Sequence, residues 1–512
     1  MNVIYHANKN VMLLLGQNLF FRDKEYRWNK FCQFHDLPEC KLIYNHMTRA
    51  MVSMTYEEFD NVFKIFKEFK SDQIKFLFSN YFIVPVEYDE MKQTDDMRVK
   101  FRPAIDDNYL SEVYEFLILP TTGCNARCFY CYERNMGKST MTDETAEKVV
   151  QYICRKAVDK RKKLRLRWFG GEPLVNMKVI RYICRRLTEE GYQYYSSMIS
   201  NGYLFSEKVV EEAKNDWKLG NVQITLDGTE AVYNKAKNYV YTNQEEVSPF
   251  KKVIDNIGYL TNNNISVTVR MNADIYNIED LKQLVRDVHL RFPEHKNLSM
   301  YAYPIFEDED TVRTDEDREI LYKKIWEIED VMAECDFVNG SPMTESIRSY
   351  HCMVDNGRNV TISPNGDLGL CEHYVDSDFW GHIDDDSNEK RDWSIIYSWR
   401  DYQPALDICY DCPIYPSCIR TKKCLDLRTC HPMHKEFNIR RDAANMVRSY
   451  EMWLEREAKK KRGNNGNRNG NCQGGSCQNN KKQQQPMPQP QEQKKEPLIK
   501  TFTNKVKSLF KK

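Results

Sequence analysis

Residues 121–133 read TTGCNARCFYCYE and place Cys124, Cys128 and Cys131 in the spacing C-x3-C-x2-C. The motif directly follows an apolar run at residues 114–119 that predicts a buried strand. A structural zinc site closes with four protein ligands, whereas a cubane iron–sulfur cluster held by three cysteines leaves one iron open to a small molecule. The triplet therefore favours an open iron–sulfur cluster, and a zinc knuckle with a distant fourth ligand is the alternative.

Short apolar or alternating runs, each followed by a segment of helical periodicity, occupy residues 113–304. The predicted strands are 114–119, 164–169, 197–200, 222–226, 266–271 and 298–303, with helices such as 143–156, 177–190 and 250–262 between them. Alternating strands and helices are typical of a parallel βα array. The sequence thus predicts an α/β fold with a partial (β/α)6 TIM-like barrel, whose ligands sit at the carboxyl ends of the strands.

Polar motifs follow further predicted strands. We therefore expect them to lie beside the triplet at the carboxyl ends of the barrel strands, which form the mouth of the barrel. The paired glycines of WFGGEP, residues 168–173, would let the backbone approach a ligand closely and expose carbonyls to an ammonium group. The other motifs are Ser200-Asn201-Gly202, Thr225-Leu226-Asp227-Gly228 and Arg270-Met271-Asn272. Each alone could be a turn, but together they indicate a binding site.

These motifs, with the aromatic Phe129 and Tyr130 inside the cysteine loop, resemble those of radical S-adenosylmethionine (radical SAM) enzymes over about residues 113–435. The resemblance implies that the cysteine triplet holds a [4Fe-4S] cluster whose fourth iron binds the amino and carboxylate groups of S-adenosylmethionine. It further implies contacts of Gly170, Gly171 and Glu172 with the amino group, of the Tyr130 backbone with the adenine, and of Ser200 and Asn201 with the ribose, while Asp227, Arg270 and Asn272 line the same mouth.

One position departs from this family pattern. Lys237 stands where relatives often have arginine, and lysine keeps the charge but lacks the bidentate fork. No residue for proton removal carries over from the family, so no catalytic base is predicted.

Seven more cysteines follow between residues 352 and 430, and their order resembles the SPASM extension of peptide- and protein-modifying radical SAM enzymes, which binds two auxiliary [4Fe-4S] clusters. The resemblance implies that Cys409, Cys412, Cys418 and Cys430 hold one cluster, while Cys352, Cys371 and Cys424 hold the other with three thiolates. The spacing departs from the family after Cys418, where five residues replace the usual three.

An eighth cysteine of some relatives falls near Arg358, and His351 and His373 are candidates for the open position. A zinc ribbon is the alternative for this region, because C-x2-C pairs suit tetrahedral zinc equally well. Five cysteines without partner spacing are predicted to be core thiols: Cys32, Cys40, Cys154, Cys184 and Cys335.

The flanking regions differ in composition and predict separate domains. We expect an accessory domain at 1–112, a helical connector at 305–345, the SPASM domain at 346–435, a C-terminal helix at 436–461, a disordered low-complexity linker at 462–497 and a basic amphipathic helix at 498–512. Segments 44–59 and 77–90 are similar to the leading region of peptide maturases, where a small winged-helix-like module can hold a leader peptide against a strand edge. A domain that only caps the open barrel is the alternative.

The linker carries Cys472 and Cys477 in NCQGGSCQNN, which resembles the peptide cores that such enzymes modify; a plain linker is the favoured interpretation. The chain has 75 basic and 75 acidic residues, but 14 basic and 2 acidic residues from Lys459 onward give a tail of +12, and the remaining 61 basic and 73 acidic residues leave the body at −12. The overall balance argues against a nucleic-acid partner.

The chain lacks a signal-peptide pattern and any apolar run near the roughly 18 to 20 residues that span a bilayer, so we expect a cytoplasmic protein with reduced thiols. For the terminal helix the alternatives are docking on a precursor, on a partner transporter or, less favoured, on an anionic membrane surface, and packing back on the acidic body.

The sequence predicts a radical SAM oxidoreductase that modifies a ribosomally made peptide by forming a thioether or carbon–carbon cross-link. Its expected partners are that peptide or protein substrate and a one-electron donor such as flavodoxin or ferredoxin, under anaerobic conditions. One alternative is an anaerobic sulfatase-maturing enzyme, whose relatives generally begin near the triplet. Another is a non-catalytic iron–sulfur or zinc protein for electron transfer or scaffolding, which would need no nucleoside site.

Overall fold

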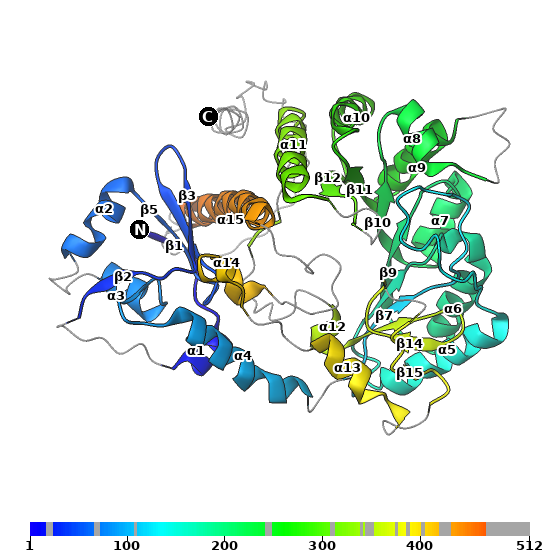
Figure 1. Ribbon diagram of the computed structural model, residues 1–512, viewed down its shortest axis with the longest axis horizontal. Helices are drawn as coiled ribbons and strands as arrows, with labels where there is room; N and C mark the ends of the chain where they lie inside the picture. The colour runs from blue at the N-terminus through cyan, green and yellow to red at the C-terminus, as the bar shows by residue number, and fades with distance from the viewer. Residues whose placement is uncertain are drawn as a thin grey trace, which may run out of the picture.

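The computed structural model describes residues 1–16, 24–65, 72–106, 110–240, 248–307, 313–337, 341–343, 353–373, 377–385, 390–400, 405–418 and 432–466 (Figure 1). Its largest sheet has the order β12-β11-β10-β9-β8-β7-β13-β14-β15. The barrel strands are β7 (Glu115–Ile118), β8 (Leu164–Trp168), β9 (Tyr194–Ser200), β10 (Leu219–Thr225), β11 (Ser266–Ala273) and β12 (Leu298–Pro304). Each of them pairs in parallel with the next strand along the chain, so the predicted α/β fold with a partial barrel is confirmed.

Amphipathic helices cover the outer face of these strands. They are α5 (Asp143–Lys156), α6 (Met177–Glu189), α7 (Glu207–Asn215), α8 (Glu230–Lys237), α9 (Pro249–Asn262), α10 (Ile278–Arg291) and α11 (Asp315–Glu334), with a 3-10 turn, η2 (Pro173–Asn176), before α6. Helix α5 begins where the Thr142 side chain accepts from the Thr145 amide, and carboxylates in its first turn favour the helix dipole. The apolar stripes of these helices and the buried strand residues form one large core.

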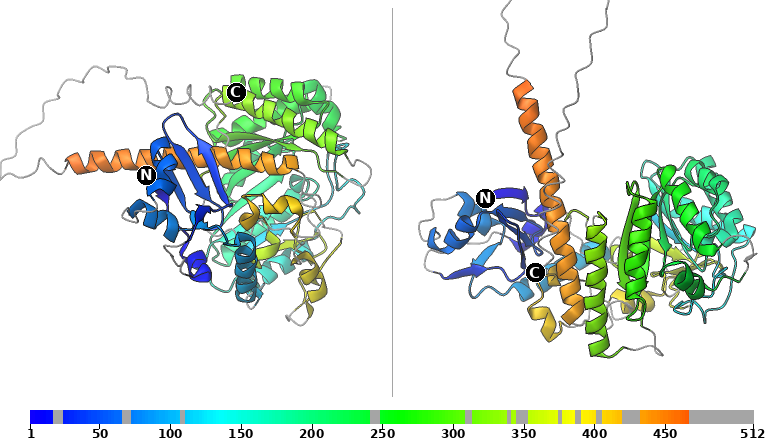
Figure 2. Two further views of the ribbon diagram at one scale, coloured as in Figure 1. Left: turned by 60° about the vertical axis from the view of Figure 1, so that its left-hand side comes forward. Right: turned by 90° about the horizontal axis from the view of Figure 1, so that it is seen from above.

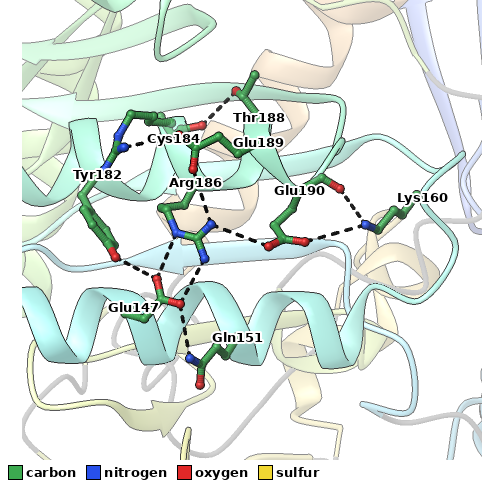
Figure 3. A network of polar contacts seen from close by, with 10 residues as sticks. Glu147, Gln151, Lys160, Tyr182, Cys184, Arg186, Thr188, Glu189 and Glu190 are labelled. Atoms are coloured by element: carbon green, nitrogen blue, oxygen red, sulfur yellow. Dashed lines mark hydrogen bonds and ion pairs between the residues drawn. The ribbon is translucent and has the colours of Figure 1, made fainter.

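Polar contacts tie neighbouring helices together on the outside of the barrel. Figure 3 shows Arg186 of α6 bound to Glu147 of α5, with Nη2 to Oε1 at 3.1 Å, and Tyr182 donating to the same carboxylate at 2.8 Å. Such partly exposed pairs contribute little net stability, but they fix the relative register of the two helices.

The strands that follow the connector extend the barrel sheet. β13 (Asn359–Ile362) pairs in parallel with β7, β14 (Asp367–Gly369) pairs antiparallel with β13, and β15 (Gly381–His382) pairs antiparallel with β14. The helices of this region are α12 (Met353–Asn356), α13 (Trp393–Arg400) and α14 (Asp407–Tyr410), with a 3-10 turn, η4 (Tyr415–Ser417). The first part of the cysteine-rich region is therefore joined to the barrel through a shared sheet.

The N-terminal region forms an antiparallel sheet of order β1-β5-β4-β3, with β1 (Asn2–Tyr5), β3 (Cys32–Asp36), β4 (Lys41–Asn45) and β5 (Met51–Met54). A smaller ribbon pairs β2 (Tyr26–Trp28) with β6 (Ile83–Pro85), and the helices are α1 (Lys9–Leu15), α2 (Tyr56–Ile65), α3 (Asp72–Ser79) and α4 (Glu90–Asp106). Alternating residues of one strand serve two cores: Ile43 packs with Val62 and Leu77, whereas Leu42 and Tyr44 pack on the opposite face.

That opposite face is covered by the C-terminal helix α15 (Pro432–Gly466), which Figures 1 and 2 show between the N-terminal sheet and α11. Met446 is fully buried against Leu42 and Tyr44, and the Gln33 side chain donates to the Ile439 carbonyl at 2.8 Å. The N-terminal sheet and the C-terminal helix thus share one core. None of the helices in the described ranges is long and apolar enough to traverse a bilayer.

Candidate functional site

The cysteine triplet lies in the loop after β7, at the carboxyl end of the barrel, and all three thiols are half-buried. The Ala126 amide approaches Cys124 Sγ at 3.4 Å, and the Asn201 side-chain amide approaches it at 3.9 Å. Burial, reinforced by the charge of Glu172, raises the pKa of the Cys124 thiol to about 12. A bound metal centre reverses this preference because it stabilises thiolates, and amide donors around sulfur are usual at iron–sulfur clusters.

The glycine pair after β8 brings two backbone segments together. The Gly171 amide donates to the Thr121 carbonyl at 3.2 Å, and the Glu172 amide donates to the Gly123 carbonyl at 2.9 Å. A Cβ on Gly171 would lie 2.3 Å from the Gly123 oxygen, and Gly170 has a φ of +128° with a Cβ position 2.2 Å from the Thr121 oxygen. We predicted that the glycine pair lets the backbone approach a ligand closely. In the structure, the glycine pair approaches the backbone of the triplet loop in this way.

Glu172 is fully buried and links the ends of β8 and β9. Its carboxylate accepts from the Ser200 hydroxyl at 2.9 Å, from the Asn201 amide at 2.8 Å and from the Leu174 amide at 3.1 Å. Burial raises the pKa of Glu172 to about 7, although these donors oppose the shift. The side chains of Glu172 and Ser200 thus hold the two strand ends in place, and their proposed contacts with a cofactor would come in addition.

A buried ionic cluster connects the triplet loop with the end of β10. Lys237 Nζ lies 3.0 Å from Asp227 Oδ2 and 2.8 Å from the Tyr130 hydroxyl, which in turn donates to Asp227 Oδ2 at 2.6 Å. Burial alone would lower the pKa of Lys237, but Asp227 and Tyr130 raise it well above its ordinary value. Lysine at this position, where relatives often have arginine, is therefore charged and paired within the protein.

The neighbouring strand end continues this network. Asn272 donates to Asp227 Oδ1 at 3.1 Å and accepts from Arg270 Nε at 2.9 Å. The structure thus brings together every predicted residue from the triplet to Asn272 at one end of the barrel. Two residues that sequence reasoning missed complete the site: Asn125 accepts from Asn201 at 2.7 Å, and Asn277 donates to the Asp227 carbonyl at 3.2 Å.

A signal for both omissions was present in the sequence. Asn125 lies inside the cysteine motif, and Asn277 follows the Arg270 strand and stands immediately before α10. Short amide side chains at such positions often satisfy backbone groups of turns.

The second cysteine group is described in part. Cys371 follows β14 and is buried, Cys409 lies on α14, and Cys412 and Cys418 flank the η4 turn. Arg98 of α4 donates to the Cys418 carbonyl at 2.7 Å, so the accessory domain supports this segment. The other predicted ligands and neighbours lie outside the described residues: Cys352, Cys424, Cys430 and His351, as do Cys472 and Cys477.

His373 bridges the two cysteine regions. Its ring lies 4.8 Å from that of Tyr132, the residue after Cys131, and 5.0 Å from that of Phe306 after β12, and its amide donates to Cys371 Sγ at 3.5 Å. Arg358 lies immediately before β13, where its carbonyl accepts from the Glu115 amide. The five predicted core thiols are buried or half-buried in the folded domains.

Residues 118–288 match the family model of the Radical SAM superfamily. The radical SAM cyclopropyl synthase TigE of Paramaledivibacter caminithermalis is 23% identical over 292 residues, which are 51% of this chain and 57% of that protein. Among solved structures, anSMEcpe with bound AdoMet and Cp18Cys peptide is 16% identical with a TM-score of 0.47, over 67% of this chain and 99% of that one. SuiB of Streptococcus suis bound to S-adenosylmethionine is 12% identical with a TM-score of 0.45, over 80% of this chain and 98% of that one.

The family match and the parallel partial barrel define a radical SAM domain. The domain covers residues 118–288, and its family implies a [4Fe-4S] cluster and S-adenosylmethionine. The residue types fit that requirement, because three half-buried thiols come from one loop at the carboxyl end of the barrel and amide groups approach Cys124 Sγ. Among the described residues the three thiols are not drawn together into a metal-binding group.

Proposed function

We propose that the protein oxidatively modifies a ribosomally made peptide, by formation of a thioether or carbon–carbon cross-link. When bound, the cluster and S-adenosylmethionine supply a 5′-deoxyadenosyl radical that removes a hydrogen atom from the substrate. Cys124, Cys128 and Cys131 would hold the cluster. The backbone around Gly170 and Gly171 and the side chain of Asn201 would orient the methionine and ribose parts of S-adenosylmethionine.

The observation that carries the peptide assignment is the open edge of the N-terminal sheet. Among the described strands, β3 pairs only with β4, so its other edge can accept a strand from a partner. Aromatic rings lie beside this edge: Trp28 stacks on Phe59 at 5.2 Å and meets Phe34 at 5.6 Å. Phe34 and Phe63 both contact Trp28 and remain 38% and 37% exposed, so the cluster presents apolar surface that a peptide could cover.

The accessory domain also touches the cysteine-rich segment, which supports a role beyond capping the barrel. Arg98 stacks on Tyr415 at 4.4 Å and the Tyr415 hydroxyl donates to Asp95 at 2.8 Å. A peptide held at β3 would therefore lie on a domain that is packed against the segment containing Cys409, Cys412 and Cys418. We propose that these cysteines, with Cys371 and the cysteines outside the described residues, would hold two auxiliary [4Fe-4S] clusters, which would supply an acceptor for the electron that the substrate radical loses when it is oxidised.

The cofactor part is tested by anaerobic reconstitution, metal analysis and measurement of 5′-deoxyadenosine after dithionite reduction. About twelve irons per chain, from three four-iron clusters, are expected, with loss of 5′-deoxyadenosine in the Cys124/Cys128/Cys131→Ala variant. The Cys371→Ala variant should lose iron but retain cleavage of S-adenosylmethionine. Zinc at these sites, or about four irons only, would contradict the auxiliary clusters and favour the scaffold alternative for this region.

The peptide part is tested by selecting an mRNA-display library of linear peptides on the reconstituted protein. Selected binders should lose affinity for the Phe34→Glu and Phe63→Glu variants. Leu13→Glu is a matched control, because Leu13 is an apolar residue of the same domain that is 82% exposed but lies on α1. If the selected peptides bound both variants with the affinity that they have for wild type, this edge would be excluded as the docking site.

A sulfatase-maturing activity is the second candidate from the same chemistry. It predicts conversion of a cysteine or serine in an unfolded sulfatase segment to formylglycine, which mass spectrometry detects directly.

A further inference from the structure

A small pocket lies where helix α5 of the barrel meets β14 and β15, the strands that extend its sheet (Figure 1). It is partly open to solvent and has room for one group of about the size of a water molecule. None of its lining residues takes part in the contacts around the cysteine triplet. Its polar lining comes from α5, from the start of β15 and from the segment before α13: Tyr152, Lys156, Trp380, Asp385, Lys390 and Arg391.

Three cations and one carboxylate line this pocket, which leaves an excess of two positive charges among the described residues. Asp385 is already engaged: Lys390 Nζ lies 3.5 Å from its Oδ1, and its Oδ2 accepts from the His382 amide at 2.9 Å. Lys156 has no carboxylate within 4.0 Å of its Nζ in the described part of the chain. Its own burial and the charges of Arg391 and Arg155 lower the pKa of Lys156. An anion in the pocket would offset this repulsion.

Arg391 is the buried cation of the pocket, with an exposed fraction of 8%. Its Nη2 donates to the Leu110 carbonyl at 3.0 Å, and its guanidinium carbon lies 5.8 Å from the ring centres of Trp380 and Trp393. Two indole rings and one hydrogen bond therefore hold the guanidinium in a fixed orientation. A preorganised guanidinium loses less side-chain entropy when it binds an oxyanion.

Two neutral donors of the pocket lining, the Tyr152 hydroxyl and the Trp380 indole Nε1, have no hydrogen-bond partner among the described residues. The two side chains are only 1% and 2% exposed, and a buried donor without an acceptor destabilises the folded protein. Burial raises the pKa of Tyr152, although the charges of Arg391 and Arg155 oppose the shift. The hydroxyl therefore stays protonated at neutral pH, where it can donate to an anion.

We propose that this pocket binds a phosphate group, with one oxygen seated among the buried donors and the other oxygens toward the open side. Guanidinium and ammonium groups are the usual partners of phosphate oxygens, and the two neutral donors supply further hydrogen bonds. A phosphate carries a charge of about −2 near pH 7, which matches the excess charge of the lining, whereas a carboxylate would neutralise only half of it. The phosphate group belongs either to inorganic phosphate or to a phosphate monoester.

A phosphate bound here would join the barrel to the strands that lead into the cysteine-rich region. Helix α5 already contacts those strands on the same side, since Arg155 Nη2 donates to the Ile383 carbonyl at 2.5 Å and Lys148 Nζ lies 3.1 Å from Asp384 Oδ2. The bound group would add contacts from α5, from Trp380 beside β15 and from Arg391 before α13. We therefore expect binding to stabilise this junction.

The first arm of the test is equilibrium dialysis of radiolabelled inorganic phosphate against the reconstituted full-length protein, saturated with S-adenosylmethionine and at an ionic strength fixed with chloride. One phosphate per chain should bind. Lys156→Gln and Tyr152→Phe should each weaken binding about ten- to hundredfold, because each removes one hydrogen bond to a charged group. Lys160→Gln is the matched control, since it removes the same charge four residues further on, where Lys160 Nζ donates to the Glu190 carbonyl at 2.6 Å.

The second arm is a melting curve of each protein with and without phosphate. Phosphate should raise the melting temperature of wild type and of Lys160→Gln, and it should raise that of Lys156→Gln and Tyr152→Phe much less. Without phosphate, Tyr152→Phe should melt no lower than wild type, because the substitution removes a buried hydroxyl that has no acceptor. A loss of binding in this variant is then not a loss of folding.

The third arm identifies the source of the phosphate group by competition with the labelled phosphate. Displacement by an equal concentration of glycerol phosphate supports a monoester ligand, and retention of the label supports inorganic phosphate. Displacement by an equal concentration of acetate overturns the proposal, as does wild-type affinity in either Lys156→Gln or Tyr152→Phe, or the absence of saturable binding. None of these measurements depends on formation of 5′-deoxyadenosine, so their outcome is independent of the proposed function.

Discussion

The buried pair of Lys237 and Asp227 offers the sharpest test of how the barrel mouth is held together. Lys237 Nζ lies 3.0 Å from Asp227 Oδ2, and the two side chains are each 3% exposed. Coulomb's law at an effective dielectric constant of about 20 gives an attraction of about 5 to 6 kcal/mol at this distance. Desolvation offsets part of it, and removing one partner of such a pair destabilises proteins by about 3 to 5 kcal/mol.

We therefore expect Lys237→Met to weaken the barrel by about 3 to 5 kcal/mol, because Asp227 would be left buried and uncompensated. The assay is hydrogen exchange of the slowest amides in β10 and β11, which reports the opening free energy of this part of the protein. Exchange should become about one hundred to several thousand times faster. Lys235→Met is the control, because Lys235 lies two residues away on α8 and is exposed.

The double variant Lys237→Met/Asp227→Asn should recover part of this loss, since it removes both charges. If Lys237→Met exchanged as slowly as Lys235→Met, the reasoning that an ion pair anchors the triplet loop would be refuted.

Three further outcomes follow from the same geometry. Gly171→Ala should prevent stable iron loading, measured by the iron content of reconstituted protein, because its Cβ would lie 2.3 Å from the Gly123 oxygen; Gly137→Ala, where a Cβ meets open space, should load normally. The pKa of Glu172 is raised to about 7, above its ordinary value, so the stability that its protonated form contributes is complete below about pH 4.5 and is lost as pH rises through 7. In Glu172→Gln the melting temperature should therefore depend less on pH between pH 5 and 8 than in wild type. A pH dependence equal to that of wild type would contradict this. Met446→Ala should cost about 2 to 5 kcal/mol and speed hydrogen exchange selectively in β4 and β5, whereas protection equal to wild type would show that α15 does not share their core.

The barrel could be predicted because its signals are local. Each strand is a short apolar run, and the predicted 222–226 and 266–271 differ from β10 and β11 only at their ends. The packing of the N-terminal sheet against the long helix α15 was harder to predict, because Leu42 and Met446 lie in one core although most of the chain separates them in sequence. The predicted helix at 436–461 lies within α15, but periodicity does not say what a helix packs against.

The site residues could be predicted as a set but not as individual contacts. Their positions at strand ends follow from the parallel topology, which places them together whatever their partners are. That Glu172 binds Ser200 and that Lys237 binds Asp227 depends on distances between strands, about which the sequence carries no information. The sequence was therefore sufficient to predict which strand ends form the mouth of the barrel. The structure was needed to identify the polar groups that hold these strand ends together.

The hydrogen bond between Gln33 and the Ile439 carbonyl joins residues 406 positions apart, and this separation has a consequence during synthesis. At about 5 to 20 residues per second, a ribosome needs roughly 20 to 80 s to add that many residues. Throughout this time the face of the N-terminal sheet that carries Tyr44 has no covering helix and is open to wrong partners. The nascent chain therefore exposes this apolar face until α15 emerges.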